Sequence, residues 1–574
     1  MRSFNKVKLF LFLLVFLSSF YFLIFNVVSA DVIGQTVQFN IDPKFEYLGR
    51  DKVSATLRKI SVTAYLYVSD DYWAGISEPE RNLFLTKLDE LAQEFDNRIY
   101  PIERAFWGLE PNPGIDNDPK IIILFTKLKD PAGGYFDTSH LYKKTEVQNS
   151  NEREMFFVSA DSVVGGKAKI FLAHEFQHLI GFNQKEFLRK ATEDTWLNEL
   201  RSEYSIKIVG YDDDYNNSNL RRRVFAFSQS PSEPLAEWKN LSPDYGVITL
   251  FAYYLADHYG DKILIDSLRS SKIGIESINE TLRLNGFSEI FSDVFTNWTM
   301  ANILNDSSVA SGKFAYKTAH LKDFKISSTQ SSSTSGLGSN LSLSNSVKDW
   351  QPVWYEFTTP IGLEGNLKLY FSGPTGSKFL IPYIVFYVNG QKEIGFMSLS
   401  GGSGVNFIKG FGSDVYKVVV IPANQSKTSD FTDNDPVAAF TIQAQIVSEV
   451  PENIVTPVPT PTLLNLAGQS IQVILDQIRS LQEELLRLQG QQISQPPMQP
   501  SLPRDLFVGL RGNDVSWLQE FLISQGVYPE ARVTGYFGPF TRSAVIRFQQ
   551  KYGIFPQIGY VGAKTRAKIQ ELIQ

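Results

Sequence analysis

The residue pattern with the clearest chemical meaning in this 574-residue sequence is His174-Glu175-Phe176-Gln177-His178. On a helix, side chains four residues apart lie on the same face, so both imidazoles would point the same way. Two imidazoles at this spacing can bind one zinc ion, and Glu175 beside them is placed to act on a water molecule. The sequence contains five histidines, and two of them have this spacing. The pattern therefore predicts a hydrolytic zinc site on a helix that Gly181 can end.

A catalytic zinc site usually has three protein ligands, so a third ligand is needed. About twenty residues after the second histidine stands Trp196-Leu197-Asn198-Glu199. This stretch resembles the second motif of the gluzincin metallopeptidases, in which an Asn-Glu pair follows HExxH and the glutamate binds zinc. The resemblance implies Glu199 as the third ligand rather than Glu193, Asp194 or Glu203, none of which follows an asparagine. It also implies that Glu203 orients a ligand histidine.

A gluzincin-like site implies hydrolysis of peptide bonds. Glu175 would accept a proton from the attacking water, and another side chain would donate to the oxyanion of the tetrahedral intermediate. The candidates for this donor are Tyr245 and, in the following helix, Tyr253, Tyr254 and His258. The three helical residues stand among apolar residues at helical spacing, which is typical of packing. Because Tyr245 stands at a loop-to-helix junction, we predict Tyr245 as the second catalytic residue.

The segment from about residue 45 to 320 has the mixed pattern of an α+β domain. Alternation from Ile60 to Val68 predicts one strand with Val62 on its apolar face. A helix is predicted over residues 79–98, and apolar runs at 120–125 and 153–158 predict buried strands. The whole segment resembles a zincin-like metallopeptidase domain of the hyicolysin-like branch of the gluzincins. In such peptidases a strand at the cleft edge pairs with the substrate backbone.

The N-terminus has the pattern of an export signal. Arg2, Lys6 and Lys8 precede an apolar run from Leu9 to Val28, and Val28-Ser29-Ala30 is a plausible cleavage site. Because the run is nearly long enough to span a bilayer, residues 1–30 are either a cleaved signal peptide or a retained signal anchor. We therefore expect an extracytoplasmic protein associated with a bacterial cell envelope. The absence of cysteine excludes disulfide bonds, a cysteine nucleophile and a thiolate zinc site.

The C-terminal residues have a second recognisable pattern. The stretches 509–522 and 534–549 resemble the peptidoglycan-binding module of bacterial cell-wall enzymes, which implies a small three-helix fold and peptidoglycan as a partner. Residues 501–574 contain nine Lys or Arg and five Asp or Glu, a net charge of +4. The whole chain carries −6, so the remaining residues carry −10. A basic module on an acidic chain suits attachment to an anionic wall.

Composition also separates the middle of the chain into parts. A Ser-rich stretch predicts a flexible linker, strand-like runs between Gly and Pro turns predict an all-β sandwich domain, and two Pro-rich stretches predict stiffer linkers. Heptad-spaced apolar residues at 471–488 predict a short coiled-coil-like helix, either a lone spacer or a weak dimer contact. The predicted division is a signal at 1–30, a metallopeptidase domain at 45–320, a Ser-rich linker at 327–346, a β-sandwich at 347–450, a Pro-rich linker at 451–462, the heptad helix at 463–490, a Pro/Gln linker at 491–503 and the peptidoglycan-binding module at 504–574.

These patterns favour a cell-wall-associated zinc endopeptidase that acts on extracellular proteins. Two alternatives stay open, a hydrolase of peptidoglycan stem peptides and a non-catalytic wall-binding adhesin. The acidic chain gives no indication of nucleic-acid binding. The expected cofactor is one catalytic zinc ion. Asp116-Asn117-Asp118 could bind calcium, but such a cluster before a proline is more typical of a turn.

Overall fold

The computed structural model describes residues 30–334, 336–432 and 434–451, and residues 504–573 apart from 508–509, 529–532, 555–556 and 558. The chain forms two compact units, residues 1–460 and 461–574. The predicted signal segment (except Ala30), the Pro-rich linkers (except Pro451) and the heptad helix with its dimer contact lie outside the described residues. Among the described residues, no helix is both long and apolar enough to cross a bilayer.

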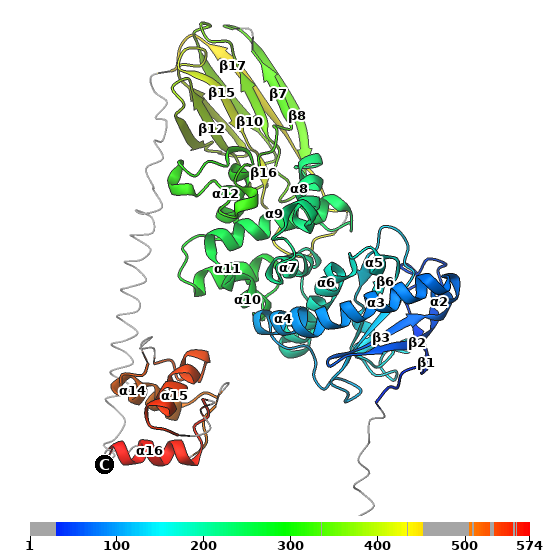
Figure 1. Ribbon diagram of the computed structural model, residues 1–574. Helices are drawn as coiled ribbons and strands as arrows, with labels where there is room; N and C mark the ends of the chain where they lie inside the picture. The colour runs from blue at the N-terminus through cyan, green and yellow to red at the C-terminus, as the bar shows by residue number, and fades with distance from the viewer. Residues whose placement is uncertain are drawn as a thin grey trace, which may run out of the picture. The chain divides into compact units, whose positions relative to one another are not determined.

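The first unit begins with a six-stranded sheet of order β1-β2-β3-β4-β6-β5 (Figure 1). Strands β3, β4 and β6 are parallel to one another, and β5 runs antiparallel to β6 at the edge. The parallel strands are continuous apolar runs because both faces of this part of the sheet are covered. Their bounds are β1 Thr36–Asn40, β2 Lys52–Ile60, β3 Ala64–Ser69, β4 Ile121–Thr126, β5 Gly134–Tyr135 and β6 Met155–Ser159.

The prediction of one strand from Ile60 to Val68 is wrong. Strand β2 ends at Ile60 and the antiparallel β3 begins at Ala64, with a turn between them in which the Val62 side chain is 79% exposed. Asp96 fixes this turn by accepting hydrogen bonds from the Val62 and Thr63 amides. Apolar and polar residues alternate without a break across this turn, so the hydrophobic pattern alone did not reveal the turn.

Helices cover one face of this sheet and continue into a helical half of the unit. The predicted helix at 79–98 is α3 followed by a π-helix, η1, and it begins with a capping box between Ser77 and Glu80. Helix α6 lies in the main hydrophobic core and continues past Gly181 as a second π-helix, η3. The helices are α2 Asp70–Gly75, α3 Glu78–Glu94, η1 Phe95–Ile99, α4 Tyr100–Trp107, α5 Asp161–Val164, α6 Ala168–Gly181, η3 Phe182–Phe187, α7 Thr195–Ile208, α8 Asn219–Gln229, α9 Ser242–Tyr259, α10 Lys262–Leu268, α11 Gly274–Leu284 and α12 Phe291–Leu304.

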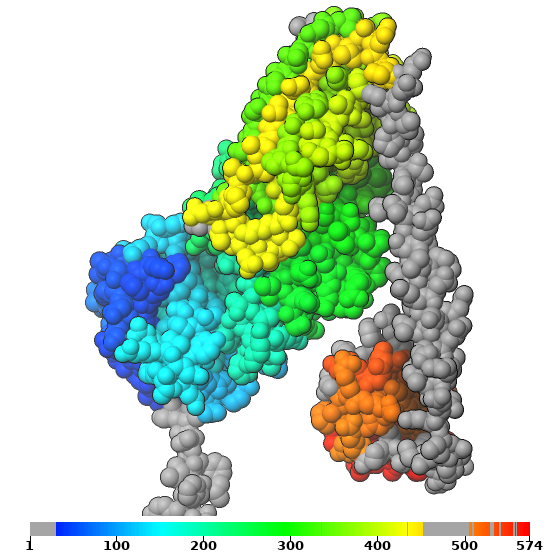
Figure 2. All heavy atoms as spheres, turned by 180° about the vertical axis from the view of Figure 1, so that it is seen from behind, coloured from blue at the N-terminus to red at the C-terminus, as the bar shows by residue number. Residues whose placement is uncertain are grey.

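Two further sheets, with orders β14-β10-β17-β8 and β13-β12-β15-β9-β7, occupy residues 330–447 and share a hydrophobic core. This β part packs directly on the helical half, so that the two form one continuous surface (Figure 2). The Trp354 indole donates to the Thr299 carbonyl at 3.0 Å, and Trp350 belongs to the helical core. The strands of the two sheets are β7 Gln330–Ser333, β8 Asn340–Val347, β9 Tyr355–Thr358, β10 Asn366–Ser372, β12 Pro382–Tyr387, β13 Lys392–Phe396, β14 Ser403–Ile408, β15 Val415–Val420 and β17 Ala438–Val447, and a separate pair is formed by β11 Phe379–Leu380 and β16 Ala423–Asn424.

The prediction of a flexible linker at 327–346 is wrong. Strands β7 and β8 lie in this stretch and form one edge of each sheet. Their serines are largely exposed, while their backbones pair with β9 and β17 and the side chains of Leu341 and Leu343 pack on the core. A strand at a sheet edge can have a polar outer face, so a Ser-rich composition did not distinguish it from a linker.

The second unit is a small helical fold built from α14 Asn513–Ser524, α15 Pro539–Lys551 and α16 Ala563–Ile573 around its own core. Its interior repeats one polar contact. The Gln519 side chain on α14 donates to the Thr541 hydroxyl at 2.8 Å, and Gln549 on α15 donates to Thr565 at 3.1 Å. Each glutamine also accepts from a loop amide, Gly535 and Gly559 respectively, so each helix is joined to the loop that follows it.

Candidate metal centre

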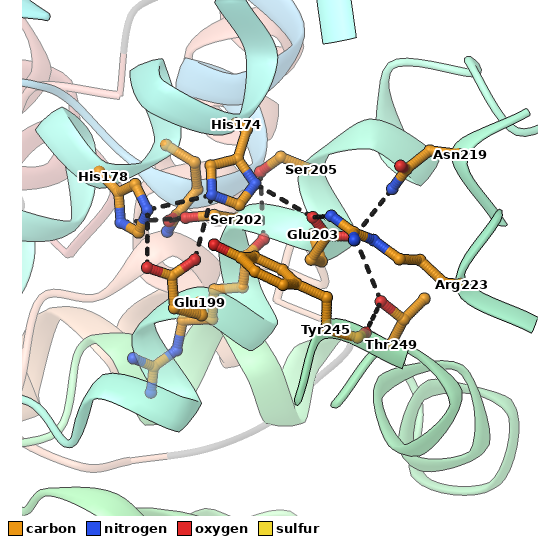
Figure 3. A network of polar contacts seen from close by, with 12 residues as sticks. His174, His178, Glu199, Ser202, Glu203, Ser205, Asn219, Arg223, Tyr245 and Thr249 are labelled. Atoms are coloured by element: carbon orange, nitrogen blue, oxygen red, sulfur yellow. Dashed lines mark hydrogen bonds and ion pairs between the residues drawn. The ribbon is translucent and has the colours of Figure 1, made fainter. Parts of the chain in front are cut away.

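Three side chains converge where α6 and α7 pack together. His174 and His178 project from one face of α6, and Glu199 projects from α7 toward both imidazoles (Figure 3). The Nε2 atoms of the histidines are 3.2 Å apart. The Glu199 carboxylate lies 3.1 Å from Nε2 of His174 and 3.6 Å from Nε2 of His178. Among the described residues, this is the one group of three side chains with the donor spacing of a metal site.

The donor set fits a divalent metal ion. Tetrahedral zinc with bonds of about 2.0–2.1 Å separates its ligand atoms by about 3.3 Å, which is close to the distances between these three groups. Burial would raise the pKa of Glu199, but the imidazoles of His178 and His174 lower it to about 2, so the carboxylate is anionic. Two imidazoles and one carboxylate match the ligand types of a hydrolytic zinc site.

His174 is oriented by a buried charged network. Its Nδ1 atom faces a carboxylate oxygen of Glu203 at 3.4 Å. Arg223 from α8 binds both oxygens of Glu203 at 2.6 and 2.7 Å, and Asn219 donates to the same carboxylate at 2.7 Å (Figure 3). A proton held on Nδ1 leaves Nε2 free to bind a metal. Glu203 therefore lies where the gluzincin resemblance implied.

His178 is oriented by an uncharged hydrogen-bond partner, Ser202, that the sequence had not indicated. Its Nδ1 atom lies 3.1 Å from the Ser202 hydroxyl, which donates to the Gln177 side-chain carbonyl at 2.6 Å. Ser202 and Glu203 follow Glu199 by three and four residues, so both lie beside Glu199 on one face of α7. This spacing could have indicated that Ser202 lies close to the predicted ligands. Arg223 and Asn219 had no comparable signal because they reach the site from another helix.

Glu175 lies beside the metal-ligand cluster and against the edge strand of the six-stranded sheet. A Cβ atom added to Gly134 of β5 would lie 2.8 Å from Oε1 of Glu175, so this close approach requires glycine. Burial raises the pKa of the Glu175 carboxyl to about 7, although both imidazoles oppose the shift. A carboxylate with a pKa near neutrality can accept and return a proton at physiological pH.

Two cavities, of about 400 and 300 Å³, flank Glu175 and His174. Tyr245 and Asn240 line both cavities, and the Tyr245 hydroxyl donates to the Asn240 side-chain carbonyl at 2.8 Å. The Tyr245 ring centre is 6.3 Å from the ring centre of His174. The structure thus brings the predicted catalytic tyrosine to the candidate site.

The other candidates are engaged elsewhere. Tyr253 donates to Asp212, Tyr254 donates to the Lys313 carbonyl, and His258 contacts the Ala315 carbonyl. Of the rival ligands, Glu193 is ion-paired with Arg201 and Lys185.

The loop Asp116-Asn117-Asp118 forms a turn rather than a cluster of free oxygen ligands. Asp116 is ion-paired with Arg153 and accepts the Asp118 amide, and Asp118 accepts the Tyr65 hydroxyl. The calcium interpretation therefore has no support in the geometry of this loop.

An α+β body with a two-histidine, one-carboxylate centre and an adjacent glutamate has the arrangement of a mononuclear metallohydrolase. The chain is 27% identical over 259 residues to a neutral metalloprotease, ShpI, of Staphylococcus hyicus, covering 40% of this chain. It spans about half of that relative, 54% of its length. Residues 511–570 match the family model described as "Putative peptidoglycan binding domain". These matches support the resemblance to a metallopeptidase with a C-terminal peptidoglycan-binding module.

Solved structures give low overall similarity. A periplasmic inhibitor of g-type lysozyme from Aeromonas hydrophila, PliG, aligns over 20% of this chain and 96% of its own, with 10% identity and a TM-score of 0.15. The pre-peptidase C-terminal domain of collagenase from Bacillus anthracis aligns over 20% of this chain and 93% of its own, with 10% identity and a TM-score of 0.14. Scores this low carry no argument about fold or function.

Proposed function

We propose that this chain is a zinc-dependent metalloendopeptidase that cuts extracellular proteins while attached to the cell wall. The observation that carries the proposal is the convergence of His174, His178 and Glu199 beside Glu175, at the edge of a sheet and between two cavities. The similarity to a neutral metalloprotease supports it independently. We assign the three converging residues as metal ligands and Glu175 as the general base.

Zinc bound by these ligands would supply Lewis acidity toward water and the peptide carbonyl. Glu175 takes the proton of the attacking water and returns it to the leaving amine, for which a pKa near neutrality is suitable. The Tyr245 hydroxyl, which donates to Asn240 in the free protein, turns to the carbonyl oxygen as negative charge develops there. Glu203 and Ser202 keep the two imidazoles in the tautomer that binds the metal.

The substrate backbone pairs with β5 in this proposal. One edge of β5 is hydrogen-bonded to β6. Because β5 is the last strand of the sheet, its other edge is available for pairing with a substrate. Gly134 brings this edge into contact with Glu175. An extended peptide added at this edge would therefore carry its backbone past the general base and the metal ligands.

The fold and localisation complete the proposal. We assign the catalytic part to a zincin-like domain and the two sheets of residues 330–447 to a β-sandwich that belongs to the same compact unit. The peptidoglycan-binding match fits an extracytoplasmic location and a wall anchor. Residues 1–30 would be the export signal or anchor, and the heptad helix a spacer between protease and anchor.

Casein cleavage by the purified protein, with its zinc content measured, tests this function. Glu175→Gln is the matched variant because it keeps the size of the side chain while removing the base. We expect about one zinc per chain in both proteins and cleavage by the parent alone. A zinc-loaded parent that ignores casein but releases stem peptides from purified peptidoglycan would support the hydrolase alternative. Absence of zinc from both proteins would contradict the metal centre and favour a wall-binding adhesin.

A further inference from the structure

We propose that the larger of the two cavities selects substrates with an acidic side chain, preferably glutamate, immediately after the cleaved bond. This inference rests on the proposed endopeptidase function and adds the substrate class. It follows from the cations that line the cavity, from the lack of carboxylate partners for three of the four, and from the direction of β5 past the candidate metal centre.

The cavity combines apolar walls with a cationic lining. Its volume is about 400 Å³, and it opens beside Glu175 and His174. Apolar lining comes from both sides of the cleft and consists of Phe45, Pro131, Ala132, Ile170, Phe171 and Ile206. Four cations line the same cavity, namely Lys44, Lys129, Arg222 and Arg223. A glutamate side chain has the matching composition, because its methylene groups can contact apolar walls while its carboxylate reaches a cation.

Three of the four cations have no ion pair with a carboxylate among the described residues. Arg223 is neutralised by its bidentate contact with Glu203. Lys129 donates to the Pro43 carbonyl at 2.8 Å, and Arg222 donates to the Asn219 side-chain oxygen at 2.6 Å, so both contacts are with neutral acceptors.

The remaining charges do not balance. Apart from Glu175 and the paired Glu203, the one acidic residue in the lining is Asp130, against Lys44, Lys129 and Arg222. With Glu175 and the Glu203–Arg223 pair left aside, the cations in the lining outnumber the acids by two, and they still outnumber them by one when Glu175 is counted as a carboxylate, in a chain whose net charge is −6. A cationic recess in an acidic protein attracts anionic groups selectively.

The direction of β5 assigns this cavity to one side of the cleaved bond. Residues 130–134, before and at the start of β5, line the larger cavity, and residues 134–138 line the smaller one. We place the substrate strand antiparallel to β5, the sense in which β6 pairs with the opposite edge of β5. It therefore passes the smaller cavity first and the larger one after the metal centre, so the larger cavity receives the residue that follows the cleaved bond.

The experiment uses the full-length zinc-loaded protein and pairs of otherwise identical peptides. One pair has Glu or Gln after the scissile bond, and the other has Glu or Gln before it. We expect the parent to cleave the first pair with about a tenfold higher kcat/KM for Glu than for Gln, and to show no preference in the second pair. Raising the salt concentration should reduce the preference, since it screens charges.

Arg222→Gln should reduce the preference severalfold, and Arg222→Gln with Lys129→Gln should abolish it while Gln peptides are still cleaved. The matched control is Arg221→Gln, on the same helix one residue earlier. Arg221 donates to the Asn216 carbonyl and does not line the cavity, so its loss should leave the ratio unchanged. Equal cleavage of the first pair, or a preference in the second pair only, would overturn the proposal.

A binding measurement separates this proposal from the catalytic one. Peptides that begin with Glu or Gln resemble the product that would leave the larger cavity, and their binding to the Glu175→Gln variant can be measured calorimetrically. Tighter binding of the Glu peptide, lost with Arg222→Gln, would support an acid-binding cavity even if no peptide were cleaved. Equal binding would overturn it even if casein cleavage confirmed the protease.

Discussion

The two sides of the cleft are built differently. On the metal side, His174, His178 and Glu199 come from two packed helices, and buried partners hold both imidazoles. On the substrate side, a two-residue strand and a loop residue, Asn240, supply the contacts, and Asn240 is exposed. The metal side is thus preorganised by the helical core, whereas the substrate side depends on backbone approach and a polar loop. Changes on the two sides should therefore separate metal binding from turnover.

The largest effect is expected on the metal side, from Glu199→Ala. Loss of the anionic ligand leaves two imidazoles, which should reduce bound zinc well below one per chain and lower kcat/KM by at least about a thousandfold. Metal analysis after gel filtration and a peptide assay measure both. Glu186→Ala is the control for zinc content, because Glu186 lines the smaller cavity without contacting the proposed ligands. Full zinc content in Glu199→Ala would show that the metal lies elsewhere.

On the substrate side, Tyr245→Phe should lower kcat by about 10²–10³ while zinc content stays unchanged. The hydroxyl contacts an exposed asparagine in the free protein, so its loss should cost little stability. An interaction made only in the transition state lowers kcat with little change in KM. Tyr254→Phe on the same helix is the control, since its hydroxyl binds the Lys313 carbonyl. Loss of zinc from Tyr245→Phe would contradict the claim that the substrate side can be changed without affecting metal binding.

The same contrast explains what could be predicted from the sequence. The helix spacing of His174 and His178 follows from local geometry, and Glu199 was indicated by a short motif, so the sequence predicted the three side chains that converge in the structure. Strand β5 has two residues and begins with glycine, so it gave no strand signal, although it forms the cleft edge. Arg223 approaches Glu203 only because α7, α8 and α9 pack together, which no local pattern encodes.

Glu203→Gln should test how far the metal side depends on its ionic network. Metal affinity or activity should fall about 10–100-fold because Nδ1 of His174 loses its anionic acceptor. The variant should also be destabilised by about 3–5 kcal/mol, because the Arg223 guanidinium stays buried without a carboxylate. Urea unfolding and zinc titration measure the two effects.

A second variant distinguishes those two effects. Adding Arg223→Met to Glu203→Gln removes the unpaired cation and should recover part of the stability without recovering metal affinity. Recovery of affinity together with stability would mean that Glu203 acts through folding alone and not through the orientation of His174.

Ser202→Ala should have the smallest effect, because the support of His178 is a neutral hydrogen bond. Removing the hydroxyl should cost about 1 kcal/mol, which corresponds to a loss of about fivefold in zinc affinity. Ser202→Thr keeps the hydroxyl and should retain most of the affinity if the buried site accepts one methyl group. Zinc competition with a chelator would rank both variants against Glu203→Gln. A larger loss from Ser202→Ala than from Glu203→Gln would contradict the ranking, because it would make the neutral contact with His178 more important than the charged network around His174.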